Sequence, residues 1–161
     1  MTYGIFDEEN HKFYTYMSDV FKGMDNAQLN YNWLITDSEC YPIDEELRRM
    51  FYQEYCWLSG DELSAIVQKE DFQWIWGCLC GFPKELSLED VLRYPLPSAQ
   101  YYNGYYQNPV SVQHPLSIVE IVACDSSWTL IISKEKAVID SYMKNYPKCK
   151  DLFACNEHRS L

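Results

Sequence analysis

Histidine, cysteine and serine side chains are the groups in this sequence that could carry catalytic chemistry. The chain has three histidines, His11, His114 and His158. A histidine that meets a thiol or a hydroxyl in the folded chain can activate it as a nucleophile, but the nucleophile elbow G-x-S-x-G does not occur in the sequence. The Walker and G-x-G-x-x-G loops that bind phosphates do not occur either. The sequence therefore predicts a protein that is not an enzyme and binds no cofactor.

The seven cysteines raise the questions of metal binding and redox state. Cys149, Cys155 and His158 carry soft ligand atoms that suit zinc, but their C-x5-C-x2-H spacing is irregular and no fourth ligand is evident. We predict that these three residues form no metal site. Metal binding by them is the alternative, because their side chains are chemically able to bind zinc. The odd number of cysteines, without a secretion signal, favours reduced thiols. Cys78 and Cys80 lie two residues apart in an apolar run, which places both on one strand face as small core residues.

The negative charge of the chain is concentrated in its first part. The net charge is -11, and residues 1–94 hold 18 acids and 7 bases, whereas residues 95–161 hold 6 of each. This balance argues against nucleic-acid binding, which needs a basic surface. It suits a basic protein partner, or it serves only as a soluble acidic surface. For the first case we predict Asp44, Glu45 and Glu46 as partner-binding residues.

A tyrosine-rich segment, residues 99–115, is the strongest candidate for an interface. The segment has no charged residue, and its Asn103-Gly104 pair is typical of a type I′ turn, so it predicts a protruding hairpin or an ordered loop. Tyrosine offers a large, fairly rigid contact area with a polar tip and is frequent at interface hot spots. The alternative is that two tyrosines pack inward and two decorate a loop. The predicted partner-binding tyrosines are Tyr101, Tyr102, Tyr105 and Tyr106.

Composition and hydropathy indicate one soluble domain over residues 1–161, with the insertion at 99–115 and a loosely assigned tail at 148–161. The chain is 47% hydrophobic with a mean hydropathy of -0.37, as expected of a globular protein. No apolar run approaches the roughly 18–20 residues that span a bilayer. The first ten residues, MTYGIFDEEN, lack the basic and apolar parts of a signal peptide. We therefore expect a cytoplasmic protein that does not associate with membranes.

Residues 116–146 contain the clearest structural pattern. Two apolar runs rich in Ile and Val flank a short polar gap, which predicts a β-hairpin over residues 117–124 and 128–132. A helix is expected to follow, with Ser133 as its N-cap and Pro147 as its end. Its predicted apolar face consists of Ala137, Ile139, Tyr142, Met143 and Tyr146, with Val138 at the edge.

The rest of the chain alternates strand and helix patterns. We predict strands over residues 2–6, 31–36 and 71–81, the last of these central in the sheet because both of its faces are apolar. Helices are predicted over residues 9–23, after the capping box Ser59–Glu62, and after Ser87. Residues 44–49 are either a helical turn or an exposed loop. The order β-α-β-α-β-α-β-β-α, with its final hairpin, predicts an α+β domain with helices packed on a mixed or antiparallel sheet.

Four short strings resemble an uncharacterised family found in bacilli and other Firmicutes. The resemblance extends from about Tyr3 to Tyr146, apart from the insertion at residues 99–115. The family has no assigned activity, so the resemblance implies a fold and no site residues. Small acidic α+β proteins of this kind are also similar in type to the immunity proteins that neutralise bacterial toxins. The strings are Tyr31-Asn32-Trp33, SGDEL at Ser59–Leu63, Phe82-Pro83-Lys84, and Cys124-Asp125-Ser126-Ser127 with its following strand and Lys134-Glu135-Lys136.

Together these features predict a non-enzymatic protein-binding domain, in its most specific form an immunity protein for a basic toxin domain. Negative charge would steer the association, and buried tyrosines would set the dissociation rate. One alternative is a small-ligand-binding protein or enzyme with a pocket under the insertion. Another is a domain whose role cannot be read from local sequence.

Overall fold

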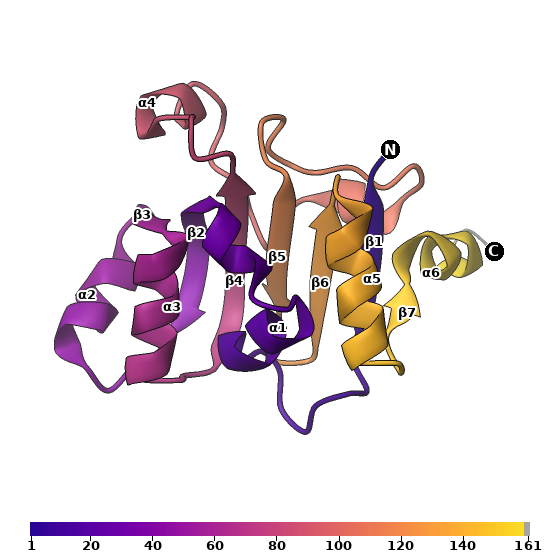
Figure 1. The fold of residues 1–161 in the computed structure, drawn as a ribbon, viewed down its shortest axis with the longest axis horizontal. Coiled ribbons are helices and arrows are strands. Elements are labelled where there is room, and N and C mark those ends of the chain that lie inside the picture. The colour runs from indigo at the N-terminus through magenta and orange to yellow at the C-terminus, as the bar shows by residue number, and fades with distance from the viewer. Residues whose placement is uncertain (160–161) are drawn as a thin grey trace.

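An antiparallel sheet of seven strands forms the framework of the computed structural model, which describes residues 1–159 (Figure 1). The strands lie in the order β3-β2-β4-β5-β6-β1-β7, and each neighbouring pair is antiparallel. This arrangement confirms the predicted α+β class. The strands are β1 (Tyr3–Asp7), β2 (Asn32–Cys40), β3 (Tyr55–Ser59), β4 (Trp74–Phe82), β5 (Val119–Cys124), β6 (Trp128–Ser133) and β7 (Lys150–Asp151).

Helical segments cover both faces of the sheet. One face carries α1 (Met17–Gly23), α2 (Glu45–Tyr52), α3 (Gly60–Lys69) and α5 (Lys136–Asn145) (Figure 1). The other face carries α4 (Leu88–Val91), the insertion with its 3-10 helix η2 (Asn103–Tyr106), and α6 (Leu152–Arg159). A further 3-10 helix, η1 (Ala27–Asn30), precedes β2. None of the helices within residues 1–159 has both the length and the apolar character needed to cross a bilayer.

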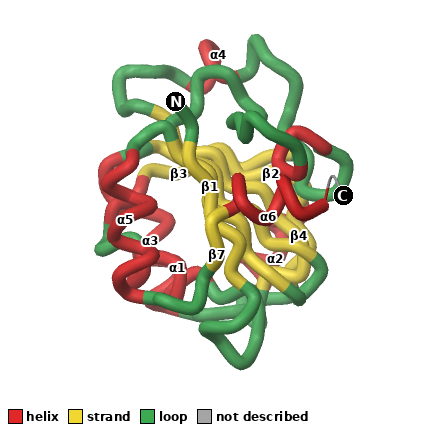
Figure 2. Tube along the Cα trace, turned by 90° about the vertical axis from the view of Figure 1, so that its right-hand side faces the viewer, coloured by secondary structure: helices red, strands yellow, loops and turns green. Residues whose placement is uncertain are grey.

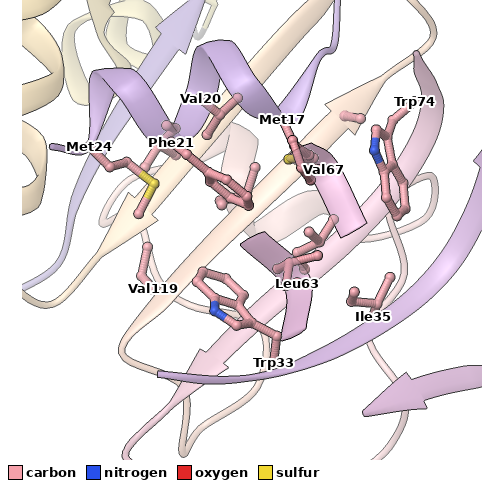
Figure 3. Packing of buried hydrophobic residues seen from close by; sticks show 14 of the residues in the cluster. Met17, Val20, Phe21, Met24, Trp33, Ile35, Leu63, Val67, Trp74 and Val119 are labelled. Carbon is pink, nitrogen blue, oxygen red and sulfur yellow. The ribbon is translucent and has the colours of Figure 1, made fainter. Parts of the chain in front are cut away.

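The larger core lies between the sheet and the four helices on its first face. Trp33 and Trp74, from β2 and β4, are almost completely buried there, and Leu63 of α3 packs beside them (Figure 3). Met17 and Phe21 of α1 close the same cluster. Because complete burial of a large apolar side chain contributes about 1.5–3 kcal/mol, this cluster is a major source of stability.

A second core lies on the opposite face, where the strands present Leu34, Cys80 and Phe82. Tyr105 of η2 and Leu152 of α6 are fully buried against them. The insertion is therefore a covering layer of the domain. The sheet is apolar on both faces, as the sequence of β4 predicts, and β4 lies inside the sheet between β2 and β5.

Two local predictions are confirmed, although the first strand of the hairpin begins at Val119 and not at residue 117. The hairpin joins β5 to β6 through Asp125 and Ser126, whose φ angles of 50° and 54° lie in the left-handed region typical of a type I′ turn. The capping box at the start of α3 is present, because the Ser59 side chain accepts from the Glu62 N–H and the Glu62 side chain accepts from the Ser59 N–H.

The last predicted helix forms, but its start and its buried face differ from the prediction. The helix α5 begins after Glu135, and the Ser133 hydroxyl accepts a hydrogen bond from the Glu135 N–H one residue before it. Val138 is buried with Ile139 and Tyr142, whereas Ala137 and Met143 are exposed. Val138 therefore belongs to the face that meets the sheet, and Ala137 and Met143 do not. The strands β3 and β7 and the helix α6 were not predicted.

The prediction of a helix over residues 9–23 is wrong for residues 9–16, which form an irregular loop. The buried carboxylate of Asp7 organises this loop, because Asn10 Nδ2 and the Tyr14 hydroxyl donate to its Oδ1 at 2.8 and 3.1 Å. The Tyr142 hydroxyl donates to Oδ2 at 2.6 Å, and the His11 ring lies 3.5 Å from the same oxygen. These contacts outweigh the helical spacing of the apolar residues, and His11 therefore lies in a loop and not in a first helical turn.

Asp7 is expected to make the stability of the fold depend on pH. Burial alone would raise the pKa of Asp7, but the interactions with His11, Tyr142 and Asn10 outweigh burial and lower the pKa to about 2. Since an unfolded Asp has a pKa of about 3.9, the ionised group stabilises the folded state above about pH 4. This contribution, about 2–3 kcal/mol, is lost as the pH falls through about 2.

We predict that Asp7→Asn removes this pH dependence. The difference in the free energy of unfolding between wild type and variant should be largest near pH 6 and shrink by about 2 kcal/mol toward pH 2. Urea denaturation at a series of pH values measures it, with Asp61→Asn, at an exposed carboxylate, as the matched control. A difference for Asp7→Asn that stays constant from pH 6 to pH 2 would contradict the assignment.

Candidate functional site

The insertion at residues 99–115 forms an ordered loop and not a hairpin. Neither Asn103 nor Gly104 has a positive φ, so the predicted type I′ turn is wrong, and both residues belong to the 3-10 helix η2. Tyr105 of this helix is completely buried, and its backbone carbonyl accepts from Asn156 Nδ2 of α6 at 2.9 Å. Of the two readings of the segment from sequence, the ordered loop is therefore confirmed.

One buried carboxylate, that of Glu120 in β5, fastens the insertion to the sheet. Its Oε2 accepts hydrogen bonds from the Tyr105 hydroxyl at 2.5 Å and from the Gln113 N–H at 2.8 Å. Its Oε1 accepts from the His114 N–H at 2.8 Å and from the Ser117 hydroxyl at 2.7 Å. A buried carboxylate is stable only when such donors replace water, and four donors meet this requirement.

Further polar contacts extend this attachment toward β2. The side chain of Gln113 accepts from the Ser98 N–H at 2.7 Å and donates to the Ser98 carbonyl at 2.8 Å. The Ser98 hydroxyl and the Ala99 N–H both donate to Asp37 Oδ2, at 3.1 and 2.8 Å. The first residues of the insertion therefore sit on a carboxylate of β2, and Glu120 of β5 holds the later ones.

His114 is placed where its ring cannot activate a nucleophile. Its Nδ1 accepts from the Leu116 N–H at 3.2 Å, so Nε2 carries the proton and donates to the Val91 carbonyl at 2.9 Å. Burial lowers the pKa of His114, in keeping with a neutral ring packed against Phe82 and Tyr94. Both ring nitrogens thus serve the packing of the loop against α4.

The buried thiols beneath the insertion are poor nucleophiles. Cys78 and Cys80 lie on one face of β4, as predicted, with their sulfur atoms 3.8 Å apart. Burial raises the pKa of Cys80 well above its usual value and the pKa of Cys124 to about 12. Only the thiolate is strongly nucleophilic, so these cysteines act as small core residues at neutral pH.

The candidate zinc ligands of the tail do not converge. Cys149 packs into the core on the first face of the sheet, whereas Cys155 contacts the core on the opposite face. His158 is exposed near the end of α6. Within residues 1–159, no three His, Cys, Asp or Glu side chains are arranged to hold a metal ion.

The four predicted interface tyrosines are divided between the interior and the surface. Tyr101 is 82% exposed and Tyr105 is buried, so these two cannot act together in one surface contact. Tyr102 is half-buried, with its hydroxyl 3.1 Å from that of Ser111. Tyr106 is also half-buried and lies under the Arg159 guanidinium, 4.8 Å from its ring centre. Only Tyr101 presents most of its ring to solvent.

The predicted acidic residues lie at the start of α2. Asp44 is the N-cap, because its carboxylate accepts from the Glu46 and Leu47 N–H groups at 2.9 and 3.1 Å, and it pairs with Lys69 at 2.8 Å. Glu45 lies within 4 Å of the Arg48 and Arg49 guanidinium groups. Glu46 is exposed. The segment predicted as a helical turn or a loop is thus the first turn of a full helix.

An exposed apolar surface adjoins these acids and was not predicted. We define the β2–α2 surface by Tyr41, Ile43 and Tyr52, which are 70%, 86% and 90% exposed. A hollow of about 360 Å³ lies between the end of β2 and α2. Tyr41, Phe51 and Tyr52 line it together with Glu39, Arg48 and Arg49, whereas Ile43 lies outside its lining. Isolated exposed apolar residues are common, whereas a group of them is a less usual feature of a protein surface. The sequence signal was the pair Tyr41 and Ile43 beside the acids, on both sides of Pro42.

The fold and these sites define a small α+β domain whose buried polar groups hold its loops in place and whose exposed aromatic residues gather beside acids. A family model described as "Protein of unknown function (DUF2691)" matches residues 3–103, and the chain belongs to this family. The match contains three of the four strings on which the resemblance rested, and the strings at residues 124–136 lie beyond it. Searches of the curated proteins and of the solved structures found no match.

The attachment of the insertion leads to a second prediction. Tyr105→Phe removes the hydroxyl that donates to Glu120, and a hydrogen bond to a buried charged group contributes about 1.5–3 kcal/mol. We expect the free energy of unfolding to fall by that amount in urea denaturation. Tyr101→Phe removes an exposed hydroxyl and is the matched control, with a change within about 0.5 kcal/mol. Equal effects of the two substitutions would show that Glu120 does not anchor the loop.

Proposed function

We propose that this chain is a non-enzymatic protein-binding domain that recognises a basic partner through the β2–α2 surface. The observation that carries the proposal is the exposure of Tyr41, Ile43 and Tyr52 next to a group of acidic residues. Aromatic residues are enriched at interfaces because they bury a large area at a low cost in side-chain entropy. A basic partner fits the acids that border them.

The backbone that presents this surface is held firmly. The Glu70 carboxylate accepts from the Ile43 N–H at 2.6 Å and from the Asp44 N–H at 3.0 Å. Asp44 then caps α2, and the α2 residues Leu47 and Phe51 are buried in the core. A surface fixed in this way loses little conformational entropy on binding, and this favours affinity.

The charge around the surface supports a basic partner. Residues 39–54 include five acids and two bases, and with Lys69, which pairs with Asp44, the local net charge is −2. Both of these bases, Arg48 and Arg49, lie close to the Glu45 carboxylate and are partly neutralised by it. An acidic surface on a chain of net charge −11 raises the association rate with a basic protein, most strongly at low salt.

In its most specific form the proposal is an immunity protein that neutralises a basic toxin domain. Small size, an α+β fold and an acidic surface support this form, since such a protein acts by covering a surface and needs no catalytic group. The covered sheet and the neutral buried thiols and histidine support the absence of enzymatic activity. We also place the protein in the cytoplasm, where its seven unpaired cysteines would stay reduced.

A small-ligand-binding protein or enzyme with a pocket under the insertion is the alternative. The space directly beneath the insertion is filled by Ala99, Tyr105 and Val110. A hollow of about 420 Å³ opens on the outside of the loop, beside Tyr102 and Asn108. A bound metabolite in contact with these side chains would favour the alternative over the binding domain.

The proposal predicts how a partner would respond to substitution. The probe is the protein encoded by the adjacent reading frame, with binding measured by biolayer interferometry. Ala substitutions at Tyr41, Ile43 and Tyr52 should each weaken binding at least tenfold, mainly through faster dissociation, because each removes buried apolar contact. Reversing the charges of Glu45 and Glu46 to Lys should slow association and reduce its salt dependence.

Two controls separate this surface from others. Phe13→Ala removes another exposed aromatic side chain and should leave binding unchanged. Tyr101→Ala tests the insertion, and loss of binding with Tyr101→Ala but not with Tyr52→Ala would move the interface to the insertion. Tight binding that depends on none of these residues, or the absence of binding by the probe, would contradict the proposal.

A further inference from the structure

The strand β3 forms an open edge of the sheet. It lies at the end of the strand order, beyond β2, and within residues 1–159 no strand pairs with its outer side (Figure 1). The Ser59 N–H donates to Glu62 Oε1 at 3.3 Å and therefore does not bond to β2. Successive residues of a strand direct their N–H and C=O groups to alternate sides, so Tyr55 and Trp57 direct theirs outward as Ser59 does. The main-chain groups of Tyr55 and Trp57 are thus available to a further strand.

The opposite edge of the sheet is protected in ways that β3 is not. There the strand β7 has only two residues, Lys150 and Asp151, both charged, and the chain then enters α6 beside β1 (Figure 2). Short length and charge are features by which proteins prevent edge-to-edge pairing. The strand β3 has five residues, Tyr55–Ser59, in continuous register with β2, and it contains no charge, proline or bulge. This edge therefore keeps the properties of a template for strand pairing.

Apolar side chains flank the open edge on both faces of the sheet. Tyr55 and Trp57 are half-buried on the second face, where the Trp57 ring centre lies 6.0 Å from that of Phe82. Cys56 and Leu58 belong to the core of the first face. The side chains of an added strand lie beside these residues, alternately on the two faces, and β-branched residues pair favourably with aromatic ones across strands. The edge therefore suits a strand that places β-branched residues opposite Tyr55 and Trp57.

Acidic residues lie at both ends of β3. Glu54 precedes the strand and Asp61 follows it in the first turn of α3, and both are exposed. Residues 50–68 contain no Lys or Arg. With every charged residue of α2, β3 and α3 counted, residues 45–69 hold five acids and three bases, a net charge of −2. The pair Lys84-Glu85, beyond the end of β4, adds no net charge. An apolar strand with basic residues on either side matches this edge in charge.

We propose that the outer edge of β3 binds an extended segment of a basic partner protein by strand addition, antiparallel to β3. Main-chain hydrogen bonds would provide affinity, and the flanking side chains and acids would provide specificity. A second copy of the chain matches the edge less well, because antiparallel pairing of two β3 strands around Trp57 would bring Glu54 of one copy beside Asp61 of the other. The site goes beyond the proposed function, because it is made of main-chain groups of β3 and not of the β2–α2 surface.

Defined peptides test the inference with the full chain. The probe is acetylated, amidated Lys-Lys-Val-Thr-Val-Thr-Val-Lys-Lys, labelled with a fluorophore, and its binding is read by fluorescence anisotropy. We expect saturable binding in the micromolar range. The same peptide with Glu in place of its four Lys residues should bind about tenfold more weakly, or less tightly still, because the acids beside β3 repel it.

N-methylated peptides test the main-chain contacts. Methyl groups on the three Val nitrogens or on the two Thr nitrogens block the hydrogen bonds of one peptide edge or of the other. We expect Val to lie opposite Tyr55 and Trp57, and residues opposite each other in this phase exchange both of their hydrogen bonds. The Val-methylated peptide should therefore bind about tenfold more weakly than the Thr-methylated peptide.

One pair of protein variants isolates a single main-chain donor. Tyr55→Pro and Tyr55→Ala both remove the side chain, but only Tyr55→Pro also removes the outward N–H. Proline is tolerated on an edge strand where the N–H does not face the neighbouring strand. Tyr55→Pro should bind the probe about tenfold more weakly than Tyr55→Ala. Urea denaturation establishes that both variants are folded.

Charge variants locate the binding at β3. Glu54→Lys and Asp61→Lys should each weaken the probe severalfold. Glu157→Lys makes the same change at an exposed position of α6, at the other end of the sheet, and is the matched control. Ile43→Ala, which tests the proposed function, should leave this probe unaffected, so the two proposals can fail independently.

Four results would overturn the inference. The first is no binding of the probe, and the second is equal binding of the two N-methylated peptides. The third is binding that Glu54→Lys and Asp61→Lys reduce no more than Glu157→Lys does. The fourth is a dimer of the chain, detected by analytical ultracentrifugation, that excludes the peptide and that Tyr55→Pro dissociates, because a second copy would then be the occupant of the edge.

Discussion

The buried carboxylate of Glu120 is the constraint on which the second face of the sheet depends. Strands β4 and β5 expose apolar side chains on both faces, so each face needs a cover. Helices supply one cover. The other is largely an irregular loop, whose backbone groups must find partners when buried. Glu120 is one of these partners, because its two side-chain oxygens accept four hydrogen bonds from the loop and from its return to the sheet.

The same constraint fixes the contacts of several titratable side chains beneath the insertion. Both ring nitrogens of His114 are hydrogen-bonded to backbone groups. Burial raises the pKa of Tyr105 well above its usual value, and the neighbouring Glu120 carboxylate raises it further. Cys80 is neutral beside the same carboxylate. Asp7 plays a similar part on the first face, where it joins the loop after β1 to α5. These polar residues of the interior are thus engaged in fixing loops.

The elements that depend on local chemistry could be read from the sequence. The capping box at Ser59 and the hairpin turn at Asp125 involve neighbours within a few residues, and both form as predicted. The helix expected over residues 9–16 fails because Asp7 takes partners as distant as Tyr142, and such contacts leave no trace in local spacing. The burial of Tyr105 has the same origin. A lone glutamate inside the apolar run of β5 was the available signal for it, since an acid there needs several donors.

The exposed sites were the least predictable part, for a physical reason. Tyr41, Ile43 and Tyr52 look like core residues in sequence, and only the direction of the chain after β2 places them outside. The open edge of β3 has a similar origin, because the strand order places β3 at the end of the sheet, where no strand within residues 1–159 pairs with its outer side. Strand order depends on pairings between segments that are distant in the chain, and local sequence patterns do not report such pairings.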